Sequence, residues 1–313
     1  MQHLRQLLFP MIRIELPDRT SKAQRQREKD RIRLLDHHQE SIARKFDGGH
    51  RIITGPSGSG KTLVLVHRAA LLQQYNPAVK RILFVCYNIT LVNFIKRLLS
   101  EKQVPLGENG VEVVHFFELC AKILGESVTW EKEEPAYYDL VIEETLKKVK
   151  DYPEKYDAVL VDEGQDFSDD MYSIVVSLLN PATNHLAIAL DDNQNIYRRK
   201  QTWKDLGIQV RGRVHRLSWV YRNTSAIADF ARKFLNEKEE KAEHQPPQME
   251  LFQNFLSPAG TEPEIRQFPD LDELINHVAK QINHLHNDDG YPLSEIAIIY
   301  TQKSPDSLTG VHF

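Results

Sequence analysis

The sequence predicts an α/β protein built on a doubly wound parallel sheet. Short apolar segments alternate with longer helical segments from about residue 34 to residue 190. Strands that stay apolar along their length are typical of a sheet covered by helices on both faces. Hydrophobic residues make up 41% of the 313 residues, which is enough for a packed core. A chain of this length holds about two domains of ~150 residues each.

The predicted elements of the sheet follow one another along the chain. A helix covers residues 34–46, and Asp36 is placed to be its N-cap. The other elements, in order, are a strand at 50–54, a helix at 62–74, a strand at 81–87, a helix at 90–99, a strand at 111–114, a charged helical insertion at about 116–156, a strand at 158–161, a helix at 169–179 and a strand at 185–190.

Composition changes outside the sheet. Residues 1–33 become basic and polar, and we interpret them as a surface arm, with contact to a phosphate backbone as the alternative. Residues 34–236 form the main domain. Residues 237–262 are charged and then rich in proline, which is typical of a linker. Residues 263–313 predict the beginning of a second α/β domain, with the order strand (264–268), helix (271–286), strand (295–300).

Charge and cysteine usage limit the class of protein. The net charge is -4, so a nucleic-acid site would have to be a local groove. Cys86 and Cys120 lie in apolar stretches and are interpreted as buried thiols of a reduced compartment. No apolar run approaches the ~20 residues that cross a bilayer, and no signal peptide is evident. We therefore expect a cytoplasmic protein that has no membrane partner.

A glycine-rich loop follows the first predicted strand. Its sequence matches Gly-x-x-x-x-Gly-Lys-Thr, in which glycines allow backbone N–H groups to surround phosphate oxygens. The lysine then reaches the β- and γ-phosphates, and the threonine hydroxyl ligates Mg²⁺. We expect ATP as the nucleotide, since a plain glycine-rich turn is the poorer explanation. The predicted binding residues are Gly55, Pro56, Ser57, Gly58, Ser59, Gly60, Lys61 and Thr62.

An acidic pair ends the fourth predicted strand. Asp162 is placed to hold Mg²⁺ directly or through water, and Glu163 to polarise the attacking water as a general base. Taken alone, such a segment could be a solvated acidic turn. Beside a phosphate loop, a metal-binding carboxylate followed by a base is the better interpretation.

With these two motifs placed, residues 34–300 resemble the superfamily 1 helicases of the UvrD/Rep type. Asp162-Glu-Gly-Gln-Asp166 is the more specific of the two motifs. The likeness is greatest to the helicase part of proteins that carry a nuclease-related domain ahead of it, and these 313 residues hold no counterpart of that domain. The resemblance implies a RecA-like ATP-binding domain at 34–236. The insertion at 116–156 is short for the family.

The resemblance assigns three more residues to the ATP site. Leu35-Asp-His-His-Gln39 resembles the glutamine motif, so Gln39 would read the adenine edge. Leu190-Asp-Asp-Asn-Gln194-Asn-Ile-Tyr197 resembles the sensor motif and places Gln194 near the γ-phosphate. Leu217-Ser-Trp-Val-Tyr-Arg222-Asn resembles the motif whose arginine touches that phosphate. From the residues alone, Gln39 is equally a surface glutamine and Arg222 a core-edge arginine.

The resemblance also implies contacts with single-stranded nucleic acid. The matching segments are Phe84–Thr90, Val113–Leu119 and the end of the sensor motif. The family often has a stacking tryptophan where this sequence has Arg199, so cation–π or phosphate contact would replace stacking there. Each aromatic could instead belong to the core. The expected contact residues are Tyr87, Asn88, His115, Phe116, Tyr197 and Arg199.

These assignments predict an ATP-dependent helicase or translocase on single-stranded DNA, with RNA as a possible partner and 3′ to 5′ polarity by resemblance. Two family motifs lie beyond the end of this sequence, and one of them supplies a second arginine to the γ-phosphate. We therefore expect slow hydrolysis, and a fragment, a truncated product or a chain completed by a partner protein would each explain the ending. An ATP-switched binding module with little turnover is the alternative. A kinase is the third possibility, which the Asp-Glu-Gly-Gln-Asp motif and Gln194 disfavour.

Overall fold

A computed structural model describes residues 37–126, 135–191, 200–217 and 261–299, together with short pieces at 219–220, 224–227, 229–230, 233 and 254–255. Internal contacts divide the chain into two compact units, Met1–Glu262 and Pro263–Phe313. The further subdivision into an arm, an ATP-binding domain, a linker and a second domain stays a prediction. Asp36, the expected N-cap, lies outside the described residues.

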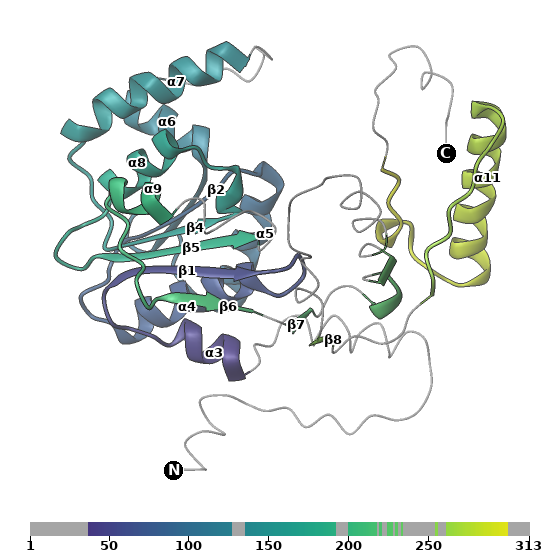
Figure 1. The fold of residues 1–313 in the computed structure, drawn as a ribbon, viewed down its shortest axis with the longest axis horizontal. Coiled ribbons are helices and arrows are strands. Elements are labelled where there is room, and N and C mark those ends of the chain that lie inside the picture. The colour runs from purple at the N-terminus through teal and green to yellow at the C-terminus, as the bar shows by residue number, and fades with distance from the viewer. Residues whose placement is uncertain are drawn as a thin grey trace, which may run out of the picture. The chain divides into compact units, whose positions relative to one another are not determined.

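Six parallel strands form the sheet of the first unit, in the order β3-β2-β4-β5-β1-β6 (Figure 1). Five of them match predicted strands because each is a run of buried, largely apolar residues. The predicted α/β class with a doubly wound parallel sheet is confirmed. The strands are β1 (Gly49–Gly55), β2 (Ile82–Cys86), β3 (Val111–His115), β4 (Ala158–Asp162), β5 (His185–Asp191) and β6 (Val214–Arg216).

Helices cover both faces of the sheet, which explains why its central strands are apolar throughout (Figure 1). In β4, Val159 and Val161 pack into one core cluster while Ala158 and Leu160 pack into the other. Each fully buried valine or leucine contributes about 1.5–3 kcal/mol. One face carries α3 (His37–Ala43), α4 (Lys61–Tyr75) and α5 (Ile89–Glu101), and the other carries α6 (Phe116–Leu124), α7 (Pro135–Lys148), α8 (Asp169–Ser177) and α9 (Lys200–Asp205).

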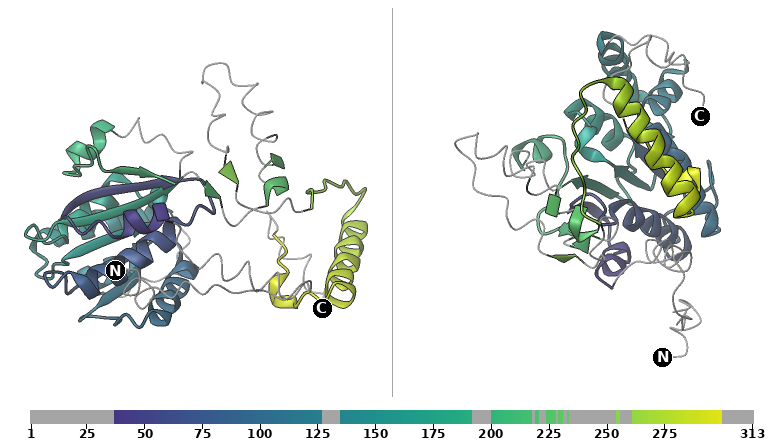
Figure 2. Two further views of the ribbon diagram at one scale, coloured as in Figure 1. Left: turned by 90° about the horizontal axis from the view of Figure 1, so that it is seen from below. Right: turned by 90° about the vertical axis from the view of Figure 1, so that its right-hand side faces the viewer.

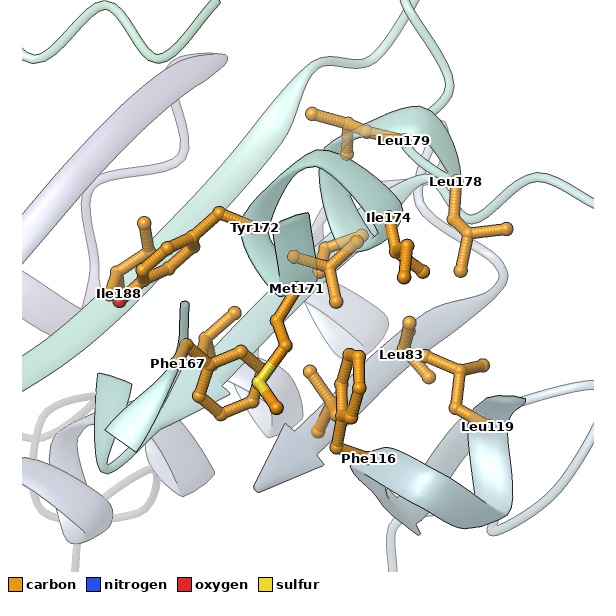
Figure 3. Close-up of a cluster of buried hydrophobic side chains, with 14 of the residues drawn as sticks. Leu83, Phe116, Leu119, Phe167, Met171, Tyr172, Ile174, Leu178, Leu179 and Ile188 are labelled. Carbon is orange, nitrogen blue, oxygen red and sulfur yellow. The ribbon is translucent and has the colours of Figure 1, made fainter. Parts of the chain in front are cut away.

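The helices of the predicted insertion at 116–156 are part of this cover. Figure 3 shows Phe116 and Leu119 of α6 directed towards Met171 of α8 and Leu83 of β2. Val141 of α7 belongs to the same cluster. The segment is helical as predicted at 116–124 and 135–151, but residues 152–156 are not helical, and residues 127–134 lie outside the described residues. Its apolar side chains complete the core.

The sixth strand, β6, was not expected from the sequence. It has three residues, and its side chains are exposed or only half-buried. Such a strand has no apolar run to mark it, and its pairing with β1 defines it. A separate pair of two-residue strands, β7 (Trp219–Val220) and β8 (Asn254–Phe255), also lies in this unit.

The second unit contains one long helix, α11 (Leu271–Asn283), which runs without a break (Figure 2). Asp270 is its N-cap, and its side chain accepts a hydrogen bond of 2.8 Å from the Glu273 N–H. The strands expected at 264–268 and 295–300 are not formed in the described residues 261–299. A strand needs a neighbour for its backbone hydrogen bonds, and this stretch contains none. Ile299 is accordingly 93% exposed.

Among the helices that the structure describes, none combines the length and apolar character that crossing a membrane requires.

Candidate active site

The carboxyl ends of β1, β5 and β4 bring the predicted ATP-site residues to one edge of the sheet. β5 lies between the other two strands. Gly55 at the end of β1 is paired with Asp191 at the end of β5, and Asp162 ends β4. The loops that follow β1 and β4 therefore flank the end of β5, in the position where open α/β sheets bind ligands (Figure 1).

The glycine-rich loop connects β1 to α4 in the way the motif requires. Gly58 and Gly60 have φ angles of 81° and 88°, in the left-handed region where glycine is favoured. A Cβ atom at Gly60 would also come within 2.6 Å of the Gln39 amide nitrogen. α4 has no side-chain N-cap, so its first backbone N–H groups are not capped by a side chain. A helix start of this kind is suited to bind an anion.

Lys61 is buried at the end of this loop, with 6% of its side chain exposed. Its ammonium donates hydrogen bonds to the Gly55 carbonyl at 2.9 Å and the Pro56 carbonyl at 3.2 Å. It also forms an ion pair with the Asp191 carboxylate. The lysine is thus held at the loop, where the sequence placed it, by two backbone oxygens and one acidic side chain.

Asp162 is fully buried, and its two carboxylate oxygens have different surroundings. Oδ1 accepts a hydrogen bond of 3.1 Å from the Glu163 N–H. Oδ2 is buried without a hydrogen-bond partner. Burial, and to a lesser degree the Glu163 charge, raises the pKa of Asp162 to about 6, although the neighbouring Thr62 side chain and the charge of Lys61 oppose this.

These two residues fit a magnesium ion. A buried carboxylate oxygen that lacks a partner, beside a threonine hydroxyl, is the all-oxygen donor set that Mg²⁺ prefers. In the described ranges no group of three or more His, Cys, Asp or Glu residues could hold a metal. Mg²⁺ usually takes one or two carboxylates and completes its shell with water and phosphate oxygens, so a small protein set is sufficient.

Glu163 is held in an uncommon backbone conformation and by a specific partner. Its φ and ψ are 51° and 44°, which is left-handed for a residue with a side chain. The Gln165 amide nitrogen donates to the Glu163 carboxylate at 2.5 Å, and the Gln165 oxygen accepts from the Asp191 N–H at 3.3 Å. The expected base is therefore oriented by a side chain that is itself attached to β5.

Gly164 shows why a small residue follows Glu163. A Cβ atom there would lie 2.6 Å from the Tyr172 hydroxyl, 2.8 Å from Ile188 and 2.8 Å from Leu190. Tyr172 also donates a hydrogen bond of 2.6 Å to the Gly164 carbonyl. The backbone after Glu163 thus lies directly on the core.

Gln39 lies against the phosphate loop. It is buried on α3, and its amide nitrogen donates to the Ser59 carbonyl at 2.8 Å. The structure thus brings Gln39 to the predicted site, but its role as a reader of adenine stays a prediction. Gln194, Tyr197, Arg199 and Arg222 lie outside the described residues, so their roles are also still predictions.

The expected nucleic-acid contacts differ in exposure. Tyr87 follows β2 and is 39% exposed, with its ring 5.9 Å from that of His115 and 6.2 Å from that of Phe117. Asn88 is exposed and caps α5, accepting a hydrogen bond of 3.0 Å from the Thr90 N–H. These two residues are accessible to a partner.

The interpretation of Phe116 as a nucleic-acid contact is wrong. Its side chain is 0% exposed and packs edge-on against Phe117 and Phe167, with ring centroids 5.4 Å away in each case. The first residue of α6 points into the core, so its ring cannot stack on a base. His115 is also buried, and its ring accepts a hydrogen bond of 3.3 Å from the Phe117 N–H as the N-cap of α6. Burial lowers the pKa of His115.

Two residues of this site were not assigned roles from the sequence, Gln165 and Asp191. Both lie inside motifs that the sequence did identify. Gln165 lies two positions after Glu163, and Asp191 lies three positions before Gln194. Their position could have indicated a role, because polar residues that follow adjoining strands of a parallel sheet converge at one edge.

A glycine-rich loop between a strand and a helix, with a buried lysine and a nearby buried aspartate, defines a P-loop nucleotide-binding domain. The sequence profile of a family described as an AAA domain matches residues 38–200, just over half of the chain. The chain therefore belongs to the AAA domain family.

Three solved structures are similar to parts of the chain. The UvsW helicase from bacteriophage T4 is 12% identical over 61% of this chain and 67% of that one, with a TM-score of 0.37. The Pif1 helicase from Bacteroides, in complex with ADP-AlF3 and ssDNA, is 14% identical over 65% and 46%, with a TM-score of 0.34. Domain III of the Thermotoga maritima replication initiation protein DnaA is 15% identical over 68% and 70%, with a TM-score of 0.28. TM-scores this low do not establish a common fold, so the fold assignment rests on the sheet itself. Among curated proteins, none matches this chain.

Proposed function

We propose that this chain is the ATP-binding and ATP-hydrolysing part of a helicase or translocase that acts on single-stranded nucleic acid. The observation that carries the proposal is the convergence of Lys61, Asp162 and Glu163 at one edge of the sheet. This set provides a phosphate-binding cation, a metal-binding carboxylate and a base. DNA as the preferred strand, and movement from 3′ to 5′, are supported by the resemblance of the motifs to UvrD/Rep-type helicases.

The proposed hydrolysis uses each of these residues at a stated atom. The Lys61 ammonium and the uncapped N–H groups of α4 bind the β- and γ-phosphates. The Thr62 hydroxyl and Asp162 would hold Mg²⁺, which would supply positive charge to the phosphate oxygens. The Glu163 carboxylate accepts the proton of the attacking water. Gln39 would read adenine, and Gln194 and Arg222 would contact the γ-phosphate.

The nucleic-acid strand is proposed to pass Tyr87 and Asn88. Cys86, the residue before Tyr87, is paired with Asp162 in the sheet, so the exposed ring follows a strand that adjoins the ATP site. Stacking of one base on an aromatic ring contributes about 1–3 kcal/mol. Tyr197 and Arg199 are proposed to extend this path.

The wider organisation is proposed from the sequence. Residues 34–236 would form a RecA-like domain, and residues 263–313 the beginning of a second one. The composition shift at 237–262 supports a linker between them. We also propose a cytoplasmic location, since both described cysteines, Cys86 and Cys120, are free thiols.

The decisive experiment is an ATPase assay with and without single-stranded DNA or RNA. We expect turnover that rises with the strand and falls by at least about a hundredfold in Lys61→Ala and Glu163→Gln, because each removes a group needed in the transition state. Glu163→Gln should still bind ATP, whereas Lys61→Ala should bind it weakly.

Normal hydrolysis by Glu163→Gln would show that the base is another residue. Tight ATP binding by the unaltered chain, with no turnover on any strand, would support the ATP-switched binding module instead.

A further inference from the structure

The Lys61 ammonium has as many acceptors as it has protons. An ammonium carries three N–H donors. Here the Gly55 carbonyl, the Pro56 carbonyl and the Asp191 carboxylate accept them. A phosphate oxygen that binds Lys61 must therefore replace one of the three acceptors.

Asp191 is the acceptor that can be exchanged most readily. The Gly55 and Pro56 carbonyls belong to the backbone of the phosphate loop, which is fixed by β1 on one side and α4 on the other. Asp191 contributes only a side chain, 33% of which is exposed, so a side-chain rotation is enough to remove it. It is also the only one of the three that carries a full negative charge.

We propose that Asp191 competes with the nucleotide phosphates for Lys61. The carboxylate binds the lysine ammonium directly, and it gives this contact up when the β- and γ-phosphates arrive. This inference rests on the proposed function to the extent that Lys61 is taken as the phosphate-binding lysine. It adds a residue that sets nucleotide affinity and that holds the lysine at the loop.

The position of β5 explains why one residue can do this. β5 lies between β1 and β4, so its last residue is adjacent to both loops of the site. The Asp191 side chain binds Lys61, while its backbone N–H donates to Gln165, which in turn holds Glu163. Release of Lys61 therefore takes place at the residue whose backbone also supports the base.

If the ion pair between Asp191 and Lys61 were purely structural, neutralising Asp191 would change nucleotide affinity in the opposite direction to that expected from competition. If Asp191 only ordered the phosphate loop, neutralising it would loosen the loop and weaken nucleotide binding. If Asp191 competes, neutralising it removes a rival anion and strengthens binding. The sign of the change in affinity separates the two explanations.

The test is an equilibrium titration with fluorescent ADP and ATP in the presence of Mg²⁺, at low salt, on the full chain. Asp191→Asn should bind both nucleotides about three- to fivefold more tightly, the size expected for removal of one partly exposed ion pair. Asp191→Glu keeps the competing carboxylate and should bind like the unaltered chain. AMP, which has no β-phosphate, should gain nothing from Asp191→Asn.

Asp166→Asn is the matched control. Asp166 is an exposed carboxylate near Glu163 and Asp191. Its partial burial, and then the charges of these two residues, raise its pKa. Asp166 is not among the three acceptors of Lys61. It should change nucleotide affinity by less than about twofold. An equal gain in Asp166→Asn would attribute the effect to general charge and overturn the proposal, as would unchanged or weaker binding by Asp191→Asn.

The experiment separates this inference from the proposed function. Tighter binding by Asp191→Asn in a chain that turns over no ATP would support the competition and reject the motor activity. Turnover by the unaltered chain, without tighter binding by Asp191→Asn, would reject the competition alone. Failure of both the unaltered chain and Asp191→Asn to bind nucleotide would reject both.

Discussion

Burial shifts the pKa values of two ionisable residues on this sheet in opposite directions. Asp162 loses solvation at the carboxyl end of β4, which raises its pKa to about 6. His185 loses solvation at the start of β5, and together with the charges of Arg68 and Arg51 this lowers its pKa from 6.5 to about 4. Burial disfavours the charged form in both cases, so the acid is shifted up and the base down.

His185 makes the folding stability depend on pH. Between pH 6.5 and about 4 the unfolded chain binds a proton at this residue that the folded chain does not. The contribution of neutral His185 to the free energy of unfolding is therefore fully present above pH 6.5 and is lost as the pH falls towards 4. The loss is up to about 3 kcal/mol, since one pKa unit corresponds to about 1.4 kcal/mol. Urea unfolding at a series of pH values measures it.

The variant His185→Gln should lose most of this dependence, because glutamine cannot take up the proton. His286→Gln, which changes an exposed histidine of the second unit, is the control and should keep the slope. A slope that persists unchanged in His185→Gln would assign the acid sensitivity to other groups.

At the scale of elements, β5 is the strand that connects the two halves of the site. Gln165, in the short helical turn Gly164–Asp166 after β4, accepts from the β5 backbone and donates to Glu163. The position of Glu163, the proposed base, therefore depends on the register between β4 and β5, because the Gln165 side chain links Glu163 to the Asp191 backbone.

Replacement of Gln165 by methionine should separate binding from turnover. Methionine is similar in length but can neither donate to Glu163 nor accept from Asp191, so the base loses its orientation while the phosphate loop is unchanged. We expect kcat to fall about ten- to a hundredfold, the range of a misplaced catalytic group, with nucleotide affinity within about twofold. Steady-state ATPase and the fluorescent titration give the two values.

Gln73→Met is the control, because the Gln73 side chain donates its hydrogen bonds to the Lys80 and Asn109 carbonyls, away from the site. It should leave both values unchanged. A parallel loss of affinity and kcat in Gln165→Met would indicate a structural role in place of a positioning one.

The elements that could be predicted from the sequence are those that a pattern within the segment itself defines. β4 and β5 are continuous apolar runs, and burial on both faces makes that pattern unambiguous. β6 depends on its pairing with β1 and has no apolar run, so periodicity could not find it. The segments at 264–268 and 295–300 show the reverse case, because apolar residues predicted strands but no neighbouring strand is described for them.

At the scale of the molecule, the stability of the chain should come from the first unit. The buried apolar residues of the described chain all lie between Ile42 and Leu217. The described residues 261–299 include no buried side chain, and α11 has none. The first unit thus contains the complete described core.

A chain that ends at Glu262 should therefore fold and bind nucleotide. We expect its thermal transition within about 2 °C of that of the full chain, because none of the described residues 263–299 is buried, so their removal should leave the core of the first unit intact. Differential scanning calorimetry and the ADP titration measure this. A transition lower by more than about 5 °C would contradict this, because the stability of the first unit would then depend on residues 263–313.

The sequence predicted those parts of the site whose residues are close together in the chain, but not the contacts between residues that are far apart. The proposed roles of Lys61, Thr62 and Asp162 follow from motifs whose residues are neighbours in the chain. The contact between Lys61 and Asp191 joins residues 130 positions apart, and only the strand order brings them together. For the rings of Tyr87 and Phe116, the sequence fixes the residue type but not whether the ring faces solvent or core.

The left-handed backbone of Glu163 has a consequence for how this position can change over generations. Such a conformation costs a residue with a side chain about 1–2 kcal/mol relative to glycine. Selection for a robust fold alone would thus favour glycine at 163, whereas the proposed role as the base would require glutamate to be retained. On the proposed mechanism, descendant sequences that hydrolyse ATP should keep glutamate at this position, and those with glycine should keep the fold without the reaction.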